Sequence, residues 1–185
     1  MIRVIFDTET TGLLKASATP IQKQPKIIEL YAILVEGPKL KQVDEFHALY
    51  QPGERLDPII TKITSIDDKM LKGKPTWAKL HKECSEFFSH AHQVAAHNLT
   101  FDYDMVNLET KRLKITLNST KDFQWPKMKL CSVEATEHLL GRRLKLIELH
   151  NHLFGEDFDG SHRAKADVQA LHRCLAELVK RNEIL

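Results

Sequence analysis

The stretch IRVIFDTETTG, residues 2–12, decides the fold prediction for this chain. Its first half, residues 2–6, is rich in β-branched and aromatic side chains and predicts a buried strand. The strand runs directly into acids, because Asp7 and Glu9 follow with one residue between them. Side chains two positions apart in an extended chain point to the same face. Both carboxylates are therefore expected at one place on the rim of a sheet.

Two carboxylates held close together repel each other, which raises the pKa of each. A site that keeps both ionised usually contains a cation, and ligands that are all oxygen select hard ions such as Mg²⁺ or Mn²⁺. A solvated strand end is the plainer interpretation of Asp7 and Glu9 taken alone, since an acid pair of this spacing is common by chance.

The segments that follow predict a mixed α/β sheet covered by helices. Residues 27–35 and 43–50 are expected to add two strands to the first as a meander, and residues 93–96 a further short strand. Residues 13–26 and 114–128 predict irregular connections. Helices are expected to start at Ser65 and Thr76, and to span residues 99–112, 132–140, 145–154 and 163–181.

Length and composition predict one domain, residues 1–185. A chain of 185 residues with 42% hydrophobic and 28% charged residues fits a single globular unit and excludes the disordered, collagen-like and disulfide-stapled classes. No apolar run reaches the roughly 18 residues of a membrane span, and the N-terminus lacks the apolar region of a signal peptide. The cysteines are far apart in the sequence, so a reducing compartment, the cytoplasm, is expected. A net charge of +2 permits a polyanionic partner without requiring one.

Two more clusters place an acid near the start of an expected helix. HNLTFD, residues 97–102, follows the short strand and ends in Asp102, and HRAKAD, residues 162–167, ends in Asp167. His162 precedes the last helix on a segment that is expected to swing between solvent and a site. An acid that merely complements the helix dipole explains either cluster alone equally well.

Taken together, FDTETTG, HNLTFD and HRAKAD resemble, in this order, the three exonuclease motifs of the DEDDh (DnaQ-like) 3′→5′ exonucleases. This family includes the proofreading epsilon subunits of bacterial DNA polymerase III and RNase T. The resemblance extends from Ile5 to about Leu171 and implies an RNase H-like fold, with a mixed five-stranded sheet flanked by helices. One departure is the connection over residues 13–26, which is longer and more basic than usual and leaves the shape of the substrate groove open.

The resemblance implies a role for individual motif residues. The implied ligands of two divalent metal ions, Mg²⁺ or Mn²⁺, are Asp7, Glu9, Asp102 and Asp167. His162 is implied as the general base, which completes the catalytic set, and a histidine suits that role because it titrates near neutrality. The residues expected to bind substrate are Thr8, Thr10, Gly12, Leu13, His97, Asn98 and Phe101.

The implied activity is metal-dependent hydrolysis of phosphodiester bonds at the 3′ end of nucleic acid, which releases nucleoside 5′-monophosphates. Single-stranded DNA is the favoured substrate, because HNLTFD is closer to the epsilon and RNase T form than to the form in oligoribonuclease. An RNA 3′-end exonuclease and a catalytically inactive nucleic-acid-binding module remain as alternatives. A DNA polymerase or another replication protein is a candidate partner, no membrane partner is expected, and the oligomeric state stays open. The chain ends just after its last expected helix, which favours a free-standing enzyme over one tethered by a tail.

Other residues carry weaker expectations. Phe101 suits a core anchor as well as it suits a base contact. The segment 111–129 holds six basic residues and one acid, interleaved with Phe123 and Trp125. Such a mix suits the tracking of a single strand by charge and stacking, although a solvated loop is the plainer interpretation. Glu29 is expected to be a surface acid.

Overall fold

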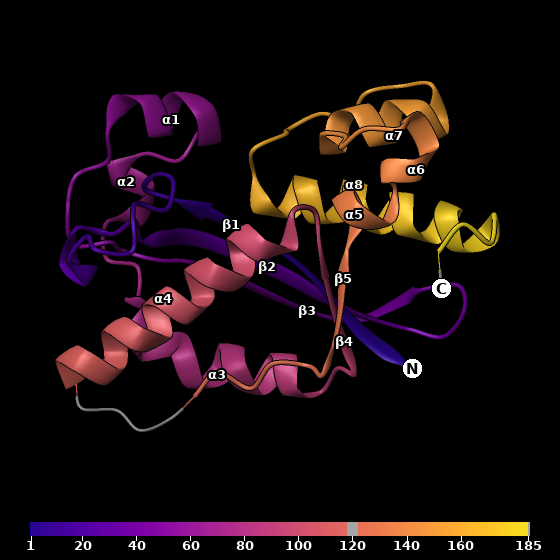
Figure 1. Cartoon of the computed structure of the whole chain (residues 1–185). Coiled ribbons are helices and arrows are strands. Elements are labelled where there is room, and N and C mark those ends of the chain that lie inside the picture. The colour runs from indigo at the N-terminus through magenta and orange to yellow at the C-terminus, as the bar shows by residue number, and fades with distance from the viewer. Residues whose placement is uncertain (118–121, 185) are drawn as a thin grey trace.

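The computed structural model describes residues 1–117 and 122–184. Within them, five strands form one sheet in the order β3-β2-β1-β4-β5 (Figure 1). The strands are β1 (Ile2–Thr10), β2 (Ile27–Glu36), β3 (Lys41–Leu49), β4 (Gln93–Ala96) and β5 (Met128–Cys131). β2 pairs antiparallel with both β1 and β3, whereas β4 pairs parallel with both β1 and β5. The mixed five-stranded sheet predicted from the sequence is therefore confirmed.

Helices lie on both faces of this sheet (Figure 1). They are α1 (Pro58–Thr64), α2 (Asp68–Leu71), α3 (Trp77–Ser89), α4 (Leu99–Leu117), α5 (Ser132–Ala135), α6 (Glu137–Leu140), α7 (Leu146–Phe154) and α8 (Ala164–Lys180). α3 and α4 pack on one face, and α8, which is backed by α7, packs on the other. Among the described residues, no helix is both long enough and apolar enough to cross a bilayer.

β1 lies in the middle of the sheet and is buried on both faces. Val4 and Phe6 belong to the core between the sheet and the α3 and α4 layer, whereas Ile5 packs with Val168 and Leu171 of α8. Because successive side chains of a strand point to opposite faces of the sheet, the same alternation continues beyond Phe6. The side chains at positions 7 and 9 are thereby directed to the α8 side, and the side chain at position 8 to the α4 side.

The long connection between β1 and β2, residues 13–26, is closed on itself by hydrogen bonds. The buried Gln24 side chain accepts from the Lys15 N–H at 3.0 Å and donates to the carbonyl groups of Lys15 and Ala16 at 3.2 and 3.1 Å. The Arg112 guanidinium of α4 donates to three carbonyl groups of the same connection. The connection is therefore a built part of the fold that is fixed against α4.

Besides a short 3-10 helix, η1 (Ile21–Lys23), the described residues contain two elements that the sequence patterns did not predict. α1 precedes the expected helix start at Ser65. Asp57 is its N-cap and accepts from the Ile59 N–H at 3.0 Å, while Pro58 occupies the first helical position. Ser65 instead ends α1 with a left-handed backbone. β5 is the other addition, and as the edge strand it is only exposed or half-buried, so it lacks the apolar run that marks a buried strand.

Two expected boundaries also move. α4 continues past residue 112 to Leu117, and the helix expected over residues 132–140 is divided into α5 and α6 around Thr136. Part of the segment expected to be irregular, residues 118–121, lies outside the described residues.

Candidate active site

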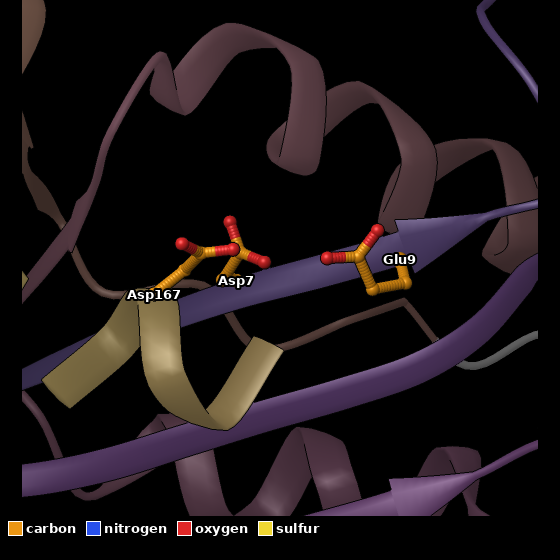
Figure 2. Close-up of side chains that lie close together, drawn as sticks. All are labelled: Asp7, Glu9 and Asp167. Atoms are coloured by element: carbon orange, nitrogen blue, oxygen red, sulfur yellow. The ribbon is translucent and has the colours of Figure 1, made fainter. Parts of the chain in front are cut away.

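Three of the predicted acids meet at one end of β1. Asp7 and Glu9 project from the same side of the strand, and Asp167 faces them from the first turn of α8 (Figure 2). One carboxylate oxygen from each residue lies within 4.8 Å of the other two, and all three side chains are half-buried. The cluster offers oxygen ligands alone, which is the donor set that hard divalent cations prefer.

Asp102 approaches the same end of β1 from α4. It has 3% of its surface exposed, and its Oδ1 accepts hydrogen bonds from the Thr8 N–H at 3.0 Å and the Thr8 hydroxyl at 2.6 Å. Its charge still reaches the cluster, because it contributes to the raised pKa of both Asp7 and Glu9. The structure thus places Asp102 beside the group of three, in a hydrogen-bonded position of its own.

Burial and repulsion by neighbouring acids raise the pKa of all four acids, and for each of them the loss of hydration on burial is the largest cause; for Asp167 the repelling charge is that of Glu29. The pKa of Asp7 rises well above its ordinary value, and the charges of the other three acids add to the effect. The pKa rises to about 8 for Glu9, about 7 for Asp102 and about 6 for Asp167. Four ionised acids are therefore unfavourable here at neutral pH unless a positive charge compensates them.

His162 lies beside the cluster, shortly before α8 begins. Its backbone N–H donates to Asp167 Oδ2 at 2.9 Å, and the residue is exposed. Its φ of 67° lies in the left-handed region, which residues other than glycine rarely adopt. His162 lines a pocket of about 640 Å³ together with Asp7 and Asp167. An imidazole that solvent can reach therefore shares a pocket with the acids.

Basic residues line the same pocket, and the motifs did not predict them as site residues. Arg143 and Lys145, which precede α7, contribute to its wall together with Phe158. The neighbouring Arg142 is instead paired with Glu148 at 3.0 Å. Two cations beside a cluster of acids suit a ligand that carries phosphate groups.

His97 and Asn98 lie in the turn between β4 and α4 and also line the pocket. Asn98 is exposed with a φ of 64°, which asparagine tolerates better than most residues. Burial lowers the pKa of His97 to about 4, so its ring is neutral. Nε2 lies 3.1 Å from the Leu144 carbonyl and donates to it, so Nδ1 accepts from the Ser132 hydroxyl at 2.8 Å. Because both ring nitrogens bond to the protein, His97 shapes the pocket through its position.

The remaining residues predicted to bind substrate differ in the apolar surface and the polar groups that they expose to solvent. Thr8 is buried, and its backbone N–H is already used within the protein. The Thr10 hydroxyl donates to the Gly12 carbonyl at 2.7 Å. Leu13 has 79% of its surface exposed. Phe101 is half-buried and packs against the core between the sheet and α4, as a core anchor would. Leu13 therefore offers free apolar surface, whereas Thr8 offers none of its polar groups.

For the segment 111–129, neither strand tracking by stacking nor the plainer interpretation, a solvated loop, fits its aromatic residues. Phe123 is only 6% exposed, and its ring centroid lies 4.6 Å from that of Trp125. The Trp125 ring also lies 5.8 Å from Phe6 of β1, and its Nε1 donates to Asn107 at 2.9 Å. Both side chains extend the core, so neither stands out from a solvated loop.

The expectation that Glu29 is a surface acid is also wrong. Glu29 of β2 is fully buried, lies opposite Glu9 in the pairing of β1 with β2, and forms a salt bridge with Arg163 at 2.9 Å. The signal was present in the sequence, because an acid inside an apolar strand needs a partner when it is buried. The sequence alone did not show which residue supplies that partner.

Comparison with known proteins places the chain among nucleases. The family model described as Exonuclease (RNase_T) matches residues 4–175. A DNA polymerase III PolC-type protein of Bacillus cereus is 31% identical over 185 residues, which cover 96% of this chain and 11% of that protein. The DNA polymerase III subunit epsilon of Escherichia coli is 31% identical over 121 residues, which cover 65% of this chain and 48% of that protein. The chain therefore spans only part of the length of these relatives.

Solved structures show the same fold. The nuclease domain of 3′hExo, a DEDDh family member bound to rAMP, superposes with a TM-score of 0.74 at 15% identity, over 97% of this chain and 92% of that one. The match of the family model covers most of the chain, including all three motifs. The resemblance predicted from those motifs is confirmed, and the chain belongs to the exonuclease family.

Proposed function

We propose that the chain is a metal-dependent 3′→5′ exonuclease that acts on single-stranded DNA and releases nucleoside 5′-monophosphates, with residues 1–185 as one exonuclease domain. The observation that carries the proposal is the convergence of Asp7, Glu9 and Asp167, from two distant elements, to within 4.8 Å. Asp102 adds a fourth buried acid beside them. A surface that only bound nucleic acid would gain nothing from four acids that repel each other and the phosphates.

The residues fit divalent cations, because their donors are all oxygen and one carboxylate oxygen from each of Asp7, Glu9 and Asp167 lies within 4.8 Å of the others. Two ions, Mg²⁺ or Mn²⁺, would be held by Asp7, Glu9, Asp102 and Asp167. Bound ions would supply compensation for the charge of the acids and the phosphodiester, and would lower the pKa of an attacking water.

His162 is the proposed general base. Water attacks the phosphorus atom of the last phosphodiester, its proton passes to the imidazole, and the bond from phosphorus to the 3′ oxygen of the shortened strand breaks. The exposed position of His162 lets the ring release that proton to solvent. The hydrogen bond from its backbone N–H to Asp167 ties the base to the acid cluster.

Substrate contacts follow from what the site exposes. Leu13 is proposed to pack against the terminal base, and Arg143 and Lys145 to lie near backbone phosphates. DNA is proposed over RNA because the PolC-type and epsilon relatives are named as DNA polymerase III proteins. The same names favour a replication polymerase as a partner and the cytoplasm as the location.

A nuclease assay tests this function. The purified chain is incubated with 5′-labelled single-stranded DNA and RNA oligomers of matched sequence in Mg²⁺ or Mn²⁺, with Asp7→Asn as the control variant. We expect a ladder that shortens from the 3′ end on DNA and is absent with Asp7→Asn. A ladder on RNA alone would overturn the DNA preference. No ladder under either metal would overturn the enzyme proposal and favour a binding module.

A further inference from the structure

Glu29 is a charged side chain with no exposed surface, and among the described residues its hydrogen bonds join it to the start of α8 and to His47 of β3. Oε2 accepts from Arg163 Nε at 3.0 Å and from the Ala164 N–H at 3.2 Å, and Oε1 accepts from Arg163 Nη2 at 2.9 Å. His47 Nε2 lies 2.8 Å from Oε1. Burial alone would raise the pKa of Glu29, but the hydrogen bonds from His47 and Arg163 outweigh it and hold the pKa at about 2. The carboxylate is thus ionised and fully engaged.

The Glu29 contacts fix the start of α8. Ala164 is the first residue of α8, and its N–H is one of the helix donors that lack a partner inside the helix. Arg163 is the N-cap residue and makes no capping hydrogen bond with its own side chain. Glu29 therefore supplies from β2 an acceptor for the first N–H of α8.

The start of α8 in turn sets two site residues. The Asp167 N–H donates to the Arg163 carbonyl at 3.0 Å, and the His162 N–H donates to Asp167 Oδ2 at 2.9 Å. His162 holds a left-handed backbone that its neighbours must maintain. Glu29 also lies opposite Glu9 in the pairing of β1 with β2. Its side chain therefore links β2, the neighbour of the strand that carries Asp7 and Glu9, to α8, which carries Asp167.

We propose that Glu29 is a positioning residue that sets Asp167 and His162 against Asp7 and Glu9 through Arg163 and Ala164. The inference rests on the proposed function, since it concerns the same site. Glu29 does not touch the reacting atoms, because its oxygens are taken by the groups named above. It also restrains Arg163, whose charge already lowers the pKa of Glu9. Without Glu29, the guanidinium would be drawn toward the acids and would compete with a cation.

Glu29 could also act differently, by strengthening cation binding through its negative charge alone. Replacing both Glu29 and Arg163 distinguishes this charge effect from the positioning role. Glu29→Gln removes a negative charge and Arg163→Gln a positive one, so the double variant keeps the net charge and leaves no unpaired buried ion. Charge alone predicts that Arg163→Gln binds Mn²⁺ more tightly than the wild type, and that the double variant binds it equally well. Positioning predicts weaker binding in all three variants.

The experiment measures Mn²⁺ affinity by titration calorimetry without nucleic acid, together with kcat and KM on a labelled DNA oligomer. We expect each variant to lose about 10-fold in Mn²⁺ affinity and about 10- to 100-fold in kcat at saturating Mn²⁺, as for groups that orient metal ligands. KM should stay within about threefold, because the contacts to the strand are unchanged. The losses of Mn²⁺ affinity and kcat in the double variant should be no larger than those in the poorer single variant, because both substitutions remove the same Glu29–Arg163 interaction.

Glu109→Gln is the matched control. Glu109 is 5% exposed, pairs with an arginine, Arg112, and accepts from the Ile27 N–H at 3.2 Å, but it lies on α4. We expect its Mn²⁺ affinity and kcat to stay within about twofold of the wild type even where its melting temperature falls. Equal losses in Glu109→Gln, or wild-type behaviour of the double variant, would overturn the positioning role. A wild-type chain that binds no Mn²⁺ would overturn the proposed function itself.

Discussion

Asp102 keeps its place through hydrogen bonds that do not need its charge. In Asp102→Asn the amide oxygen can still accept from the Thr8 N–H and hydroxyl, so the variant should fold. Loss of a proposed metal ligand should lower the rate by about 10³-fold or more, which corresponds to about 4 kcal/mol of barrier. Single-turnover assays on a labelled oligomer measure this loss.

The control for this variant is Asp104→Asn. Asp104 lies two residues further along α4 and is exposed, on a different side of the helix from the buried Asp102. Its replacement should leave the rate within about twofold of the wild type. Cleavage by Asp102→Asn at the rate of Asp104→Asn would contradict the ligand assignment.

His162→Ala should lower the rate by about 10²- to 10⁴-fold, because a general base contributes that much. Mn²⁺ affinity should change little, since the hydrogen bond to Asp167 comes from the backbone N–H, which alanine retains. Calorimetry and single-turnover kinetics separate the two effects. His152→Ala, at an exposed histidine of α7, is the control, and full turnover by His162→Ala would refute the base assignment.

At the residue scale, the sequence predicts the side chains whose direction follows from the period of a strand. It does not predict side chains whose burial depends on a partner that is distant in the sequence. The shared face of Asp7 and Glu9 follows from the two-residue period of a strand, and the structure has it. The burial of Glu29 does not follow from any local pattern, because its partner Arg163 is 134 residues away in the sequence. An ion pair of this kind exists only after β2 and α8 have packed together.

At the scale of elements, the connection over residues 13–26 carries Leu13, is closed by the side chain of Gln24 and is fixed against α4 by Arg112. Gln24→Ala removes three hydrogen bonds that close it. We expect faster proteolysis within residues 13–26 and a KM for single-stranded DNA that rises several-fold, about 3- to 10-fold. kcat should change little, because the acid cluster lies on β1 and α8. Limited proteolysis and steady-state kinetics measure these changes. An unchanged KM would show that the connection over residues 13–26 does not contribute to substrate binding.

Elements that bury an apolar run were predicted well, and elements that do not were missed. β1 to β4, α7 and α8 lie close to the expected ranges because each buries a stripe or a face. β5 was missed because an edge strand needs no such run. α1 was missed although Asp57 and Pro58 form a recognisable helix start, because its residues are mostly exposed. Tertiary position, more than propensity, decides these segments.

At the scale of the whole molecule, the acid cluster couples stability to pH when metal is removed. Acids whose pKa is raised by folding bind more protons in the folded state than in the unfolded chain. They stabilise the fold below their unfolded pKa, and the contribution is lost as the pH rises through the folded pKa. With folded pKa values of about 8 for Glu9 and about 7 for Asp102, this loss builds up as the pH rises above the ordinary pKa of the acids and ends for both near pH 8. Above the ordinary pKa of histidine, the melting temperature in chelator should therefore fall between about pH 6.5 and about pH 8.

Added Mn²⁺ should raise the melting temperature, because the ion binds the folded chain. The rise should be largest at the upper end of this pH range, where the acids are ionised and protons no longer compete with the ion. The range avoids His97, whose lowered pKa of about 4 contributes an opposite slope below the ordinary pKa of histidine. Asp7→Asn should flatten the pH profile in chelator. A melting temperature that rises with pH in chelator would contradict the clustered charges, and differential scanning calorimetry decides the matter.

The position of β1 between β2 and β4 means that Asp7 and Glu9 lie on a strand that is paired on both sides over residues 3–5. Amide deuteration of residues 3–5 then requires the sheet to open as a whole, since fraying at β3 or β5 leaves those groups covered. Activity and cooperative structure should consequently disappear together in a urea titration, and the last protons to exchange should belong to the segment that bears Asp7.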